Sequence, residues 1–331
     1  MAQNISITIV AGDMDRVAAI KDGRVQVEGC DVTFIPMEPE EVFFRAFRYA
    51  EFDCCELSFS SHMRVTSQNK AQYIGIPAFV SRVFRHSGFY IRTDRGITKP
   101  EDLRGKLVGL PEYQMTAPVW MRGILEDEYG IKPEEIHWRS GGQEEAGRDE
   151  RTPFEAPPGL DLQPIPLDRT LVEMFEAGEL DALMTARAPS SFDLGKPNID
   201  RLWPNFREVE KEYYRKTKMF PIMHLMGLRK DLHEAHPWLA GSIYKALLEA
   251  RDIAYEDLAK TAALSVALPW VDAERRDTIE LMGNDFWRYG IEECRHEIEA
   301  LARYSHSHGL SERLLTPEDL FAESTFDISK I

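Results

Sequence analysis

Strand-like segments alternate with amphipathic helical segments through the first two thirds of the chain, and this alternation constrains the fold more than any other feature. Ile5 to Val10 alternates apolar and polar residues as a half-buried strand does, and residues 39–48 place apolar side chains on one helical face behind a proline. A buried strand over Leu107 to Leu110 precedes a helical stretch over Thr116 to Leu125. This order of elements is typical of α/β proteins.

The length of the chain predicts two lobes. Its 331 residues exceed the roughly 150 of a typical domain. We expect the chain to leave the first lobe near Ile91 and to return near His224, with the helical period dominating from Pro237 onward. Lobe I then comprises residues 1–92 and 225–331, including the C-terminal helices, and lobe II comprises residues 93–224. This arrangement resembles the bilobal architecture of periplasmic binding proteins, with a ligand cleft between the lobes.

The charge balance argues against two classes of partner. The net charge is −16, from 56 acidic and 40 basic residues without a basic stripe, which excludes a nucleic-acid-binding surface. The longest apolar runs, Ile74 to Val80 and Thr261 to Val271, are shorter than the roughly 20 residues that a membrane-spanning helix needs. A small molecule remains the expected partner. Trp287, Tyr289 and Ile291 form an apolar group that belongs either to the core or to the contact of a homo-oligomer.

Cysteine usage and the first residues predict a reducing compartment. Vicinal Cys54 and Cys55 lie in an apolar run typical of buried thiols, and no CxxC spacing indicates a metal site. Residues 1–10 lack a basic region followed by a long apolar stretch, so they are interpreted as a first strand and not as a signal peptide. We therefore expect a cytoplasmic protein.

Four segments carry a resemblance to a known family: residues 52–58, 102–109, 138–145 and 178–183. They are similar to the 4,5-dihydroxyphthalate decarboxylase family, and the likeness covers nearly the whole chain. The Asp-Leu-Arg-Gly-Lys segment at Asp102 and the Gly-Glu-Leu-Asp-Ala segment at Gly178 are shared with many type II solute-binding proteins, so they support the fold alone. The Gly-Gly-Gln-Glu-Glu segment at Gly141 favours the enzyme branch.

The resemblance implies a carboxy-lyase of aromatic catabolism, in the degradation of phthalate. The expected reaction is the nonoxidative conversion of 4,5-dihydroxyphthalate into 3,4-dihydroxybenzoate and carbon dioxide, with no organic cofactor. Because each carboxylate lies para to a hydroxyl, the para oxygen can carry the charge that arises when the ring carbon is protonated. A noncatalytic solute-binding protein for a small aromatic anion is the alternative function, since most proteins of this architecture only bind.

The reaction needs a proton donor, and histidine is the natural choice near neutral pH. His62, His86 and His224 are the candidates by context, with His62 preferred because it ends the polar loop expected over Ser58 to His62 at a predicted strand end. Glu56 lies close by in sequence and could orient an imidazole or accept a hydroxyl proton. A buried structural histidine and a locally paired glutamate are the competing interpretations.

The diacid also needs cationic and hydrogen-bonding partners. Arg82 and Arg187 are the predicted carboxylate clamps, because each follows an apolar strand and a guanidinium binds a carboxylate through two hydrogen bonds. An ion pair within the protein is the competing interpretation of both. The remaining substrate-binding candidates are hydroxyl residues that could equally cap helices, and aromatic residues that could equally be core: Ser58, Ser60, Thr116, Tyr113, Phe44 and Phe220.

Two further expectations concern a metal and a lid. His62, His86, His224 and Glu56 could converge on a divalent ion, but the chain has no HxH or HExxH spacing, and we predict no metal. Ser140 to Pro158 is polar and rich in Gly and Pro, and it is expected to form a surface loop or lid.

Overall fold

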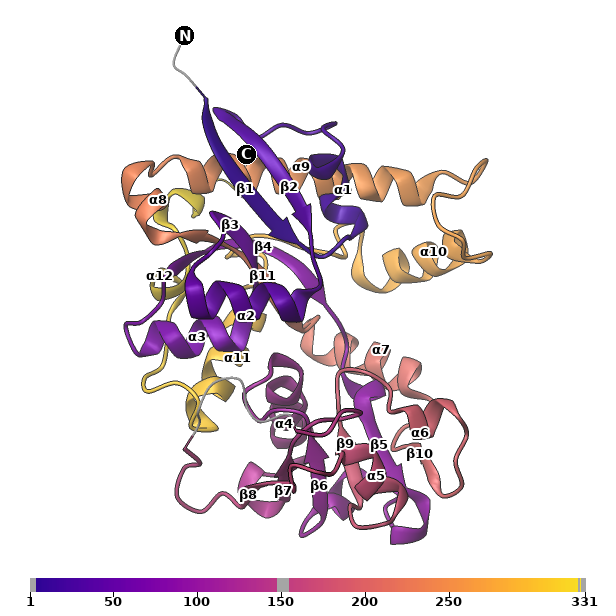
Figure 1. The fold of residues 1–331 in the computed structure, drawn as a ribbon. Coiled ribbons are helices and arrows are strands. Elements are labelled where there is room, and N and C mark those ends of the chain that lie inside the picture. The colour runs from indigo at the N-terminus through magenta and orange to yellow at the C-terminus, as the bar shows by residue number, and fades with distance from the viewer. Residues whose placement is uncertain (1–3, 148–154, 327, 329–331) are drawn as a thin grey trace. The chain divides into compact units, whose positions relative to one another are not determined.

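The computed structural model describes residues 4–147, 155–326 and 328. The chain divides into two compact units. The first unit comprises Met1–Arg82, Ile222–Glu299 and Leu315–Ile331, and the second comprises Val83–Pro221 and Ala300–Leu314. Each unit has a β-sheet of its own with helices packed against it (Figure 1).

The sheet of the first unit has five strands in the order β2-β1-β3-β11-β4. These strands are β1 (Ile5–Ala11), β2 (Cys30–Pro36), β3 (Cys54–Ser58), β4 (Tyr73–Arg82) and β11 (Ile222–Arg229). β1 pairs in parallel with β2 and β3, whereas β11 lies antiparallel between β3 and β4. All five residues of β3 are buried, as expected of a central strand covered on both faces.

Helices cover this sheet. They are α1 (Asp15–Lys21), α2 (Pro39–Tyr49), α3 (Phe59–Ser67), α8 (Lys230–Ala235), α9 (Leu239–Ala259), α10 (Val271–Met282) and α12 (Pro317–Leu320), with a 3₁₀ turn at Glu323–Thr325. α2 starts at Pro39, whose missing N–H costs nothing in a first helical turn, and ends at Ala50 in the left-handed conformation. α9 buries ten residues and packs on α1 and β4.

The second unit has a six-stranded sheet in the order β10-β5-β9-β6-β7-β8. Its strands are β5 (Phe89–Arg92), β6 (Leu107–Leu110), β7 (His137–Ser140), β8 (Leu162–Pro164), β9 (Ala182–Met184) and β10 (Ile199–Arg201). The helices are α4 (Thr116–Tyr129), α5 (Leu171–Glu176), α6 (Ser190–Asp193) and α7 (Phe206–Thr217), with 3₁₀ turns at His86–Gly88, Thr93–Arg95, Pro100–Leu103 and Pro133–Glu135. Apolar side chains of β5, β9 and α5 form a core on this sheet.

The unit boundaries differ from the predicted lobe boundaries of 1–92, 93–224 and 225–331. β5 pairs with β9 and β10, so residues 83–92 belong to the second unit. Residues 222–224 begin β11 of the first sheet, and residues 300–314 belong to the second unit because Arg303 and Tyr304 bond to Asp127 of α4. The sequence gives no sign of this last boundary, because α11 (Arg295–Ser307) continues through it without a break.

One local prediction was wrong, and one open alternative was decided. Ser58 to His62 was expected to be a polar loop, but α3 starts at Phe59, directly after β3. Phe59 and Met63 are four residues apart and fully buried, so they form the apolar face of a helix. The serines between them make this helical pattern hard to recognise in the sequence. Of the two alternatives for the apolar group at residues 287–291, Tyr289 and Ile291 follow the first, because both are buried in the core of the first unit.

The expected lid is partly outside the described residues, which lack positions 148–154. The described residues on either side, 141–147 and 155–158, contain no helix or strand. Its movement stays a prediction. No helix in the described ranges is both long enough and apolar enough to cross a membrane.

Candidate functional site

The candidate site of the first unit lies at one edge of its sheet, where β1 and β3 end and β11 begins. In the strand register, His224 of β11 stands opposite Ser58 of β3 on one side and Ser81 of β4 on the other. Gly12 follows the last residue of β1. This edge therefore gathers side chains and backbone groups from segments that are far apart in the sequence.

Glu56 and His224 form a hydrogen-bonded pair at this edge. The His224 Nδ1 atom lies 2.6 Å from Glu56 Oε1, and Glu56 Oε2 accepts a hydrogen bond of 2.8 Å from the Gly12 backbone N–H. Both carboxylate oxygens are thus occupied, and the imidazole keeps its proton on Nδ1 when it is neutral. The glutamate side chain is buried at 1% exposure, whereas the histidine side chain keeps 21% exposure.

The second ring nitrogen of His224 is the one that the pair leaves without a partner. Nε2 has no hydrogen-bond partner among the described residues, and the side chain as a whole is partly exposed. A buried carboxylate on one side of an imidazole stabilises its protonated form and orients the opposite nitrogen. An arrangement of this kind is chemically able to deliver or accept a proton at Nε2.

The sheet is irregular at this histidine. The pairing of β11 with β4 shifts register on both sides of His224, between Ile222 and His224 and again between His224 and Met226. Pro77 lies within β4 and has no N–H to donate to the neighbouring strand. Such irregularities change the direction of a side chain. Here the regular hydrogen bonding between β11 and β4 is interrupted at the histidine of the site.

The charge environment keeps Glu56 ionised. Burial alone would raise the pKa of Glu56, but hydrogen bonds from His224 and Gly12 and the positive charges of His224 and Arg16 outweigh it, so the pKa lies below its ordinary value. The Arg16 guanidinium is itself held over the Trp287 ring, 4.2 Å from the centroid. The carboxylate is therefore charged at neutral pH and in mild acid.

An aromatic ring packs against the imidazole. Phe43 of α2 meets His224 edge-on, with ring centroids 4.7 Å apart and planes at 78°. The predicted aromatic wall at the next position, Phe44, instead contacts Tyr49 and Arg48 and is largely exposed. Adjacent residues of a helix point about 100° apart, so only one of the two can face the sheet edge.

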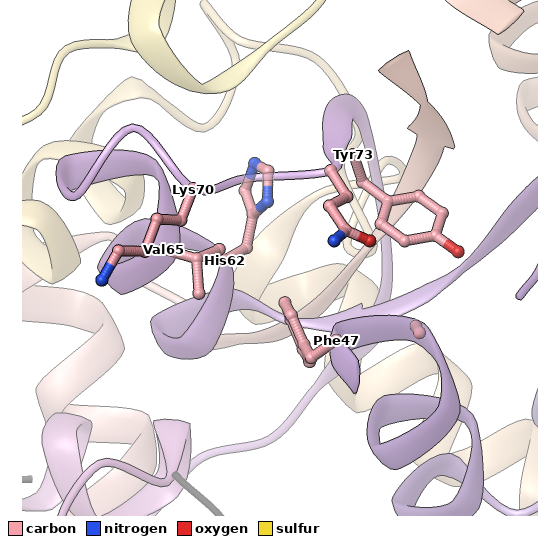
Figure 2. A pocket seen from close by; sticks show the side chains of 7 residues that line it. Phe47, His62, Val65, Lys70 and Tyr73 are labelled. Atoms are coloured by element: carbon pink, nitrogen blue, oxygen red, sulfur yellow. The ribbon is translucent and has the colours of Figure 1, made fainter. Parts of the chain in front are cut away.

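His62 is not part of this pair. Its ring is buried in α3, with Nε2 3.2 Å from the Leu320 carbonyl oxygen, and burial lowers its pKa to about 4. It also forms a wall of a small cavity between α2, α3 and β4, lined by Ala46, Phe47, His62, Val65, Lys70, Gln72 and Tyr73 (Figure 2). A neutral buried imidazole bonded to the α12 backbone favours the competing interpretation, a structural histidine, over the preferred proton donor.

His86 lies in the second unit, in an aromatic environment. Its ring is 5.1 Å from that of Trp203 and 5.2 Å from that of Tyr213, and burial lowers its pKa to about 4. Phe220 of the same unit is buried and stacks on Phe84 at 4.6 Å. These contacts are those of core residues, so neither shows the features of a substrate contact.

Arg82 is buried in an internal ion pair. Its guanidinium lies 3.6 Å from Glu297 and donates a hydrogen bond of 3.1 Å to the Cys294 sulfur, and Glu297 also binds Arg288 at 3.1 Å. The side chain has no exposed surface. This geometry favours the competing interpretation, an ion pair within the protein, over a carboxylate clamp.

The predicted hydroxyl contacts of the first unit, Ser58 and Ser60, lie close to Glu56 in sequence. Ser58 ends β3 and accepts a hydrogen bond of 3.1 Å from the Ser61 hydroxyl, and Ser60 lies buried in the first turn of α3. Their role toward a substrate stays a prediction.

In the second unit, Arg187 is exposed and lies in the loop after β9. This loop is tied to the loop after β7. Gln143 donates hydrogen bonds of 3.2 and 3.4 Å to the Arg187 and Ala188 carbonyls, and Glu144 accepts from the Ser190 N–H at 2.9 Å and the Ser190 hydroxyl at 2.7 Å. The Gly-Gly-Gln-Glu-Glu segment thus holds the backbone that presents Arg187.

Tyr113 and Thr116 lie at the start of α4. The Arg122 guanidinium covers the Tyr113 ring at 3.6 Å from its centroid, and Tyr113 is fully buried. Thr116 is the first residue of α4 and is buried as well. Both are held by their own unit, and their contact with a substrate stays a prediction.

The alternative that three histidines and Glu56 converge on a metal, which the sequence left open, finds no support in the structure. In the part of the chain that the structure describes, no three His, Cys, Asp or Glu side chains gather in an arrangement that could hold a metal ion. The structure joins only Glu56 and His224 of that set.

Sequence reasoning missed two contributors to the site. Gly12 contributes its backbone N–H, which binds Glu56. The sequence shows only that Gly12 follows a predicted strand and gives no sign of this contact. Phe43 looks like one of several apolar residues in an amphipathic helix, and only its partner across the fold distinguishes it. Both contributions depend on contacts between distant segments.

Comparison with solved structures identifies the class of protein that this fold defines. The alkanesulfonate-binding protein SsuA from Xanthomonas axonopodis pv. citri matches with a TM-score of 0.52 at 12% identity, over 98% of this chain and 99% of that chain. A putative periplasmic sulfonate-binding protein SsuA from Methylobacillus flagellatus KT matches with a TM-score of 0.56 at 11% identity, over 97% of this chain and 92% of that chain. The fold is therefore that of the bilobal, type II periplasmic binding proteins.

Within that class, curated relatives show the family. The 4,5-dihydroxyphthalate decarboxylase of Comamonas testosteroni is 43% identical over 327 residues, which are 99% of this chain and 99% of the relative. The 4,5-dihydroxyphthalate decarboxylase of Pseudomonas putida is 43% identical over 211 residues, which are 64% of this chain and 82% of the relative. No family model matches. The chain belongs to the 4,5-dihydroxyphthalate decarboxylase family.

Proposed function

We propose that this protein is a carboxy-lyase that converts 4,5-dihydroxyphthalate into 3,4-dihydroxybenzoate and carbon dioxide. The observation that carries the proposal is the Glu56–His224 pair, whose partly exposed imidazole has no hydrogen bond at Nε2 among the described residues, in a chain that belongs to a decarboxylase family. A binding protein needs no ionised carboxylate behind an accessible imidazole, whereas proton transfer does.

The chemistry of the substrate indicates what the pair does. Protonated His224 delivers the Nε2 proton to the ring carbon that bears the leaving carboxylate, and the para hydroxyl oxygen stabilises the resulting cation. The C–C bond to the carboxylate then breaks, its electron pair restores the aromatic ring, and carbon dioxide leaves. Glu56 stabilises the imidazolium before transfer, and the neutral imidazole afterwards takes a proton from solvent.

The retained carboxylate needs a cation and hydrogen-bond donors. Arg187 is our proposed carboxylate contact, because it is exposed and its loop is held by Gln143 and Glu144. Ser58 is the proposed hydroxyl contact in the first unit, because it stands opposite His224 in the strand register. Phe43 supports the imidazole ring plane.

The partner and the compartment follow from the same proposal. We infer that the partner is a small aromatic carboxylate and that nucleic acid is not a partner, since the net charge is −16. A cytoplasmic location is supported by four free cysteines, Cys30, Cys54, Cys55 and Cys294, all of them buried.

The direct test is an assay of the purified protein with 4,5-dihydroxyphthalate, following both loss of the diacid and formation of 3,4-dihydroxybenzoate. We expect stoichiometric conversion, in the presence and in the absence of a chelator. Saturable binding without turnover would support the alternative, a noncatalytic solute-binding protein for an aromatic anion. Turnover that a chelator abolishes would show that a metal ion takes part.

A further inference from the structure

Arg16 lies at the sheet edge that carries the Glu56–His224 pair. Its Nε–H donates a hydrogen bond to the backbone carbonyl of Val80 in β4. The next residue of β4, Ser81, stands opposite His224 in the strand register. The guanidinium is therefore fixed to the strand that runs beside His224, one residue away from the position opposite the histidine.

The guanidinium of Arg16 has hydrogen-bond donors in reserve. Of its five N–H groups, the one on Nε binds the Val80 carbonyl, and one on Nη1 binds the Asp15 carboxylate at 2.9 Å. Nη2 contacts only the sulfur of Met14, which is a weak acceptor. Two N–H groups thus have no acceptor among the described residues, and a third is bonded to sulfur.

The contacts of Arg16 hold the side chain in place without neutralising it strongly. The guanidinium lies over the Trp287 ring, 4.2 Å from its centroid. Its carboxylate partner, Asp15, has a side chain that is 48% exposed, and exposed ion pairs contribute little. Arg82 of the same unit differs, because it is fully buried against the buried Glu297. Arg16 can therefore exchange its carboxylate partner for a ligand, whereas Arg82 cannot do so without breaking a buried ion pair.

The chemistry of the proposed substrate requires a cation near the proton donor, and this step rests on the proposed decarboxylation. In 4,5-dihydroxyphthalate the two carboxylates lie on neighbouring ring carbons. The retained carboxylate is therefore next to the carbon that receives the proton from His224, and both hydroxyls lie on the opposite side of the ring. A planar guanidinium can bind such a carboxylate through two hydrogen bonds.

We propose that Arg16 binds the carboxylate that the product retains, and thereby makes the site specific for aromatic acids with a carboxylate next to the reacting carbon. In the first unit, Arg16 takes the role that the sequence predicted for Arg82. Arg187 stays the proposed carboxylate contact of the second unit.

The test compares the binding of two ligands by isothermal titration calorimetry. The product, 3,4-dihydroxybenzoate, carries the retained carboxylate, and 3,4-dihydroxybenzamide has nearly the same shape without the charge. We expect the wild type to bind the benzoate more tightly than the benzamide. Arg16→Gln should weaken binding of the benzoate by about 10–100-fold and change binding of the benzamide little. Arg24→Gln is the matched control, because Arg24 is an exposed arginine paired with Asp22, and it should bind both ligands as the wild type does.

A second variant changes the affinity in the opposite direction. Asp15→Asn removes the carboxylate that competes for the guanidinium, so the benzoate should bind about two- to five-fold more tightly while binding of the benzamide stays the same. Asp22→Asn, which removes another exposed carboxylate, is the control for the change in net charge. Because Asp15 is exposed, this variant tests the proposal even where Arg16→Gln does not fold.

The outcomes separate this proposal from the proposed function. Equal loss of affinity for both ligands in Arg16→Gln, without a gain in Asp15→Asn, would show that Arg16 only supports the structure of the sheet edge and would overturn the proposal. Turnover of 4,5-dihydroxyphthalate with an unchanged preference for the benzoate in Arg16→Gln would overturn the role of Arg16 alone. A preference that depends on Arg16 in a protein without turnover would support the contact and contradict the decarboxylase activity.

Discussion

A single buried carboxylate distinguishes His224 from the other candidate histidines at the scale of the residue. Both Glu56 oxygens are hydrogen-bonded, so the carboxylate is fixed, while the imidazole keeps one nitrogen without a hydrogen bond among the described residues. His62 and His86 are buried and have no carboxylate partner in the structure's described ranges; burial lowers each pKa to about 4. Burial with a charged partner favours proton transfer, and burial without one favours a neutral structural residue.

Replacing Glu56 by Gln tests the pair directly. The amide keeps the size of the side chain but loses the charge that stabilises the imidazolium, so we predict that kcat falls by about 10²–10⁴-fold with little change in KM. His224→Gln should lose a similar factor. Steady-state kinetics with 4,5-dihydroxyphthalate measure both.

The matched control for this prediction is Glu51→Gln, which removes an exposed carboxylate paired with Arg45. It should leave kcat unchanged. A Glu56→Gln enzyme with wild-type kcat would show that the pair has no part in the reaction.

The buried His62 predicts how stability depends on pH. Its pKa is about 4 in the folded protein and about 6.5 in the unfolded chain, so between these values only the unfolded chain binds the proton. The titration of His62 therefore leaves the free energy of unfolding unchanged above pH 6.5. As the pH falls from 6.5 toward 4, it lowers the free energy of unfolding by up to about 1.4 kcal/mol per pH unit.

His62→Gln removes this titration while an amide N–H can still reach the Leu320 carbonyl. The free energy of unfolding, measured with urea between pH 4 and 7, should depend less steeply on pH in the variant than in the wild type. The difference in slope should correspond to the uptake of up to one proton on unfolding. His296→Gln, at an exposed histidine of α11, should retain the wild-type slope. Equal slopes in all three proteins would contradict the buried neutral state of His62.

At the scale of the elements, two loops of the second unit act as one. Gln143 and Glu144, in the loop after β7, bond to the backbone of residues 187, 188 and 190 in the loop after β9. Thr185 donates a further hydrogen bond to the Arg187 carbonyl. Since three side chains hold this backbone, the position of Arg187 depends on a segment more than 40 residues earlier in the sequence.

Gln143→Ala tests this arrangement. If Arg187 binds the retained carboxylate, loosening its loop should raise KM by about 10-fold or more and leave kcat nearly unchanged, because orientation is lost and the proton-transfer pair is intact. Arg187→Ala should raise KM at least as much. Gln163→Ala, which removes an exposed amide bonded to Asp161, is the control with wild-type KM. An unchanged KM in the Gln143 and Arg187 variants would exclude this loop from substrate binding.

At the scale of the whole molecule, a buried ion cluster lies where the chain leaves the first unit. Arg82 is the last residue of one segment of this unit, and Glu297 lies two residues before the end of another. Glu297 binds both Arg82 and Arg288, within a core that leaves the glutamate side chain 1% exposed. Removing one member of such a cluster leaves a buried charge without compensation.

Glu297→Ala should therefore lower the free energy of unfolding by about 3–5 kcal/mol, as measured by urea denaturation. The double variant Arg82→Met with Glu297→Leu should recover much of this loss, because apolar side chains of similar volume replace the buried pair. Should Arg82→Met alone raise KM without any loss of stability, Arg82 would be a substrate contact and not a structural ion pair.

Hydrophobic patterning by itself determined the α/β class, most strands and the amphipathic α2, because burial of one face imposes a period on the sequence. The same reading placed Glu56 and His224 among the site candidates, and the resemblance indicated the family. It did not show which histidine reacts. His62 follows a strand and a run of hydroxyl residues, which is a plausible setting for a functional residue, yet α3 turns its ring into the core.

Only the tertiary structure decided the partners. His224 meets Glu56 across 168 residues, Glu56 meets the Gly12 N–H across 44, and Arg82 meets Glu297 across the first unit. A periodic pattern reports which face of an element is buried, but it carries no information about which element covers that face. The pairing of β11 between β3 and β4, with its irregular register at His224, is what turns two separate polar residues into one site.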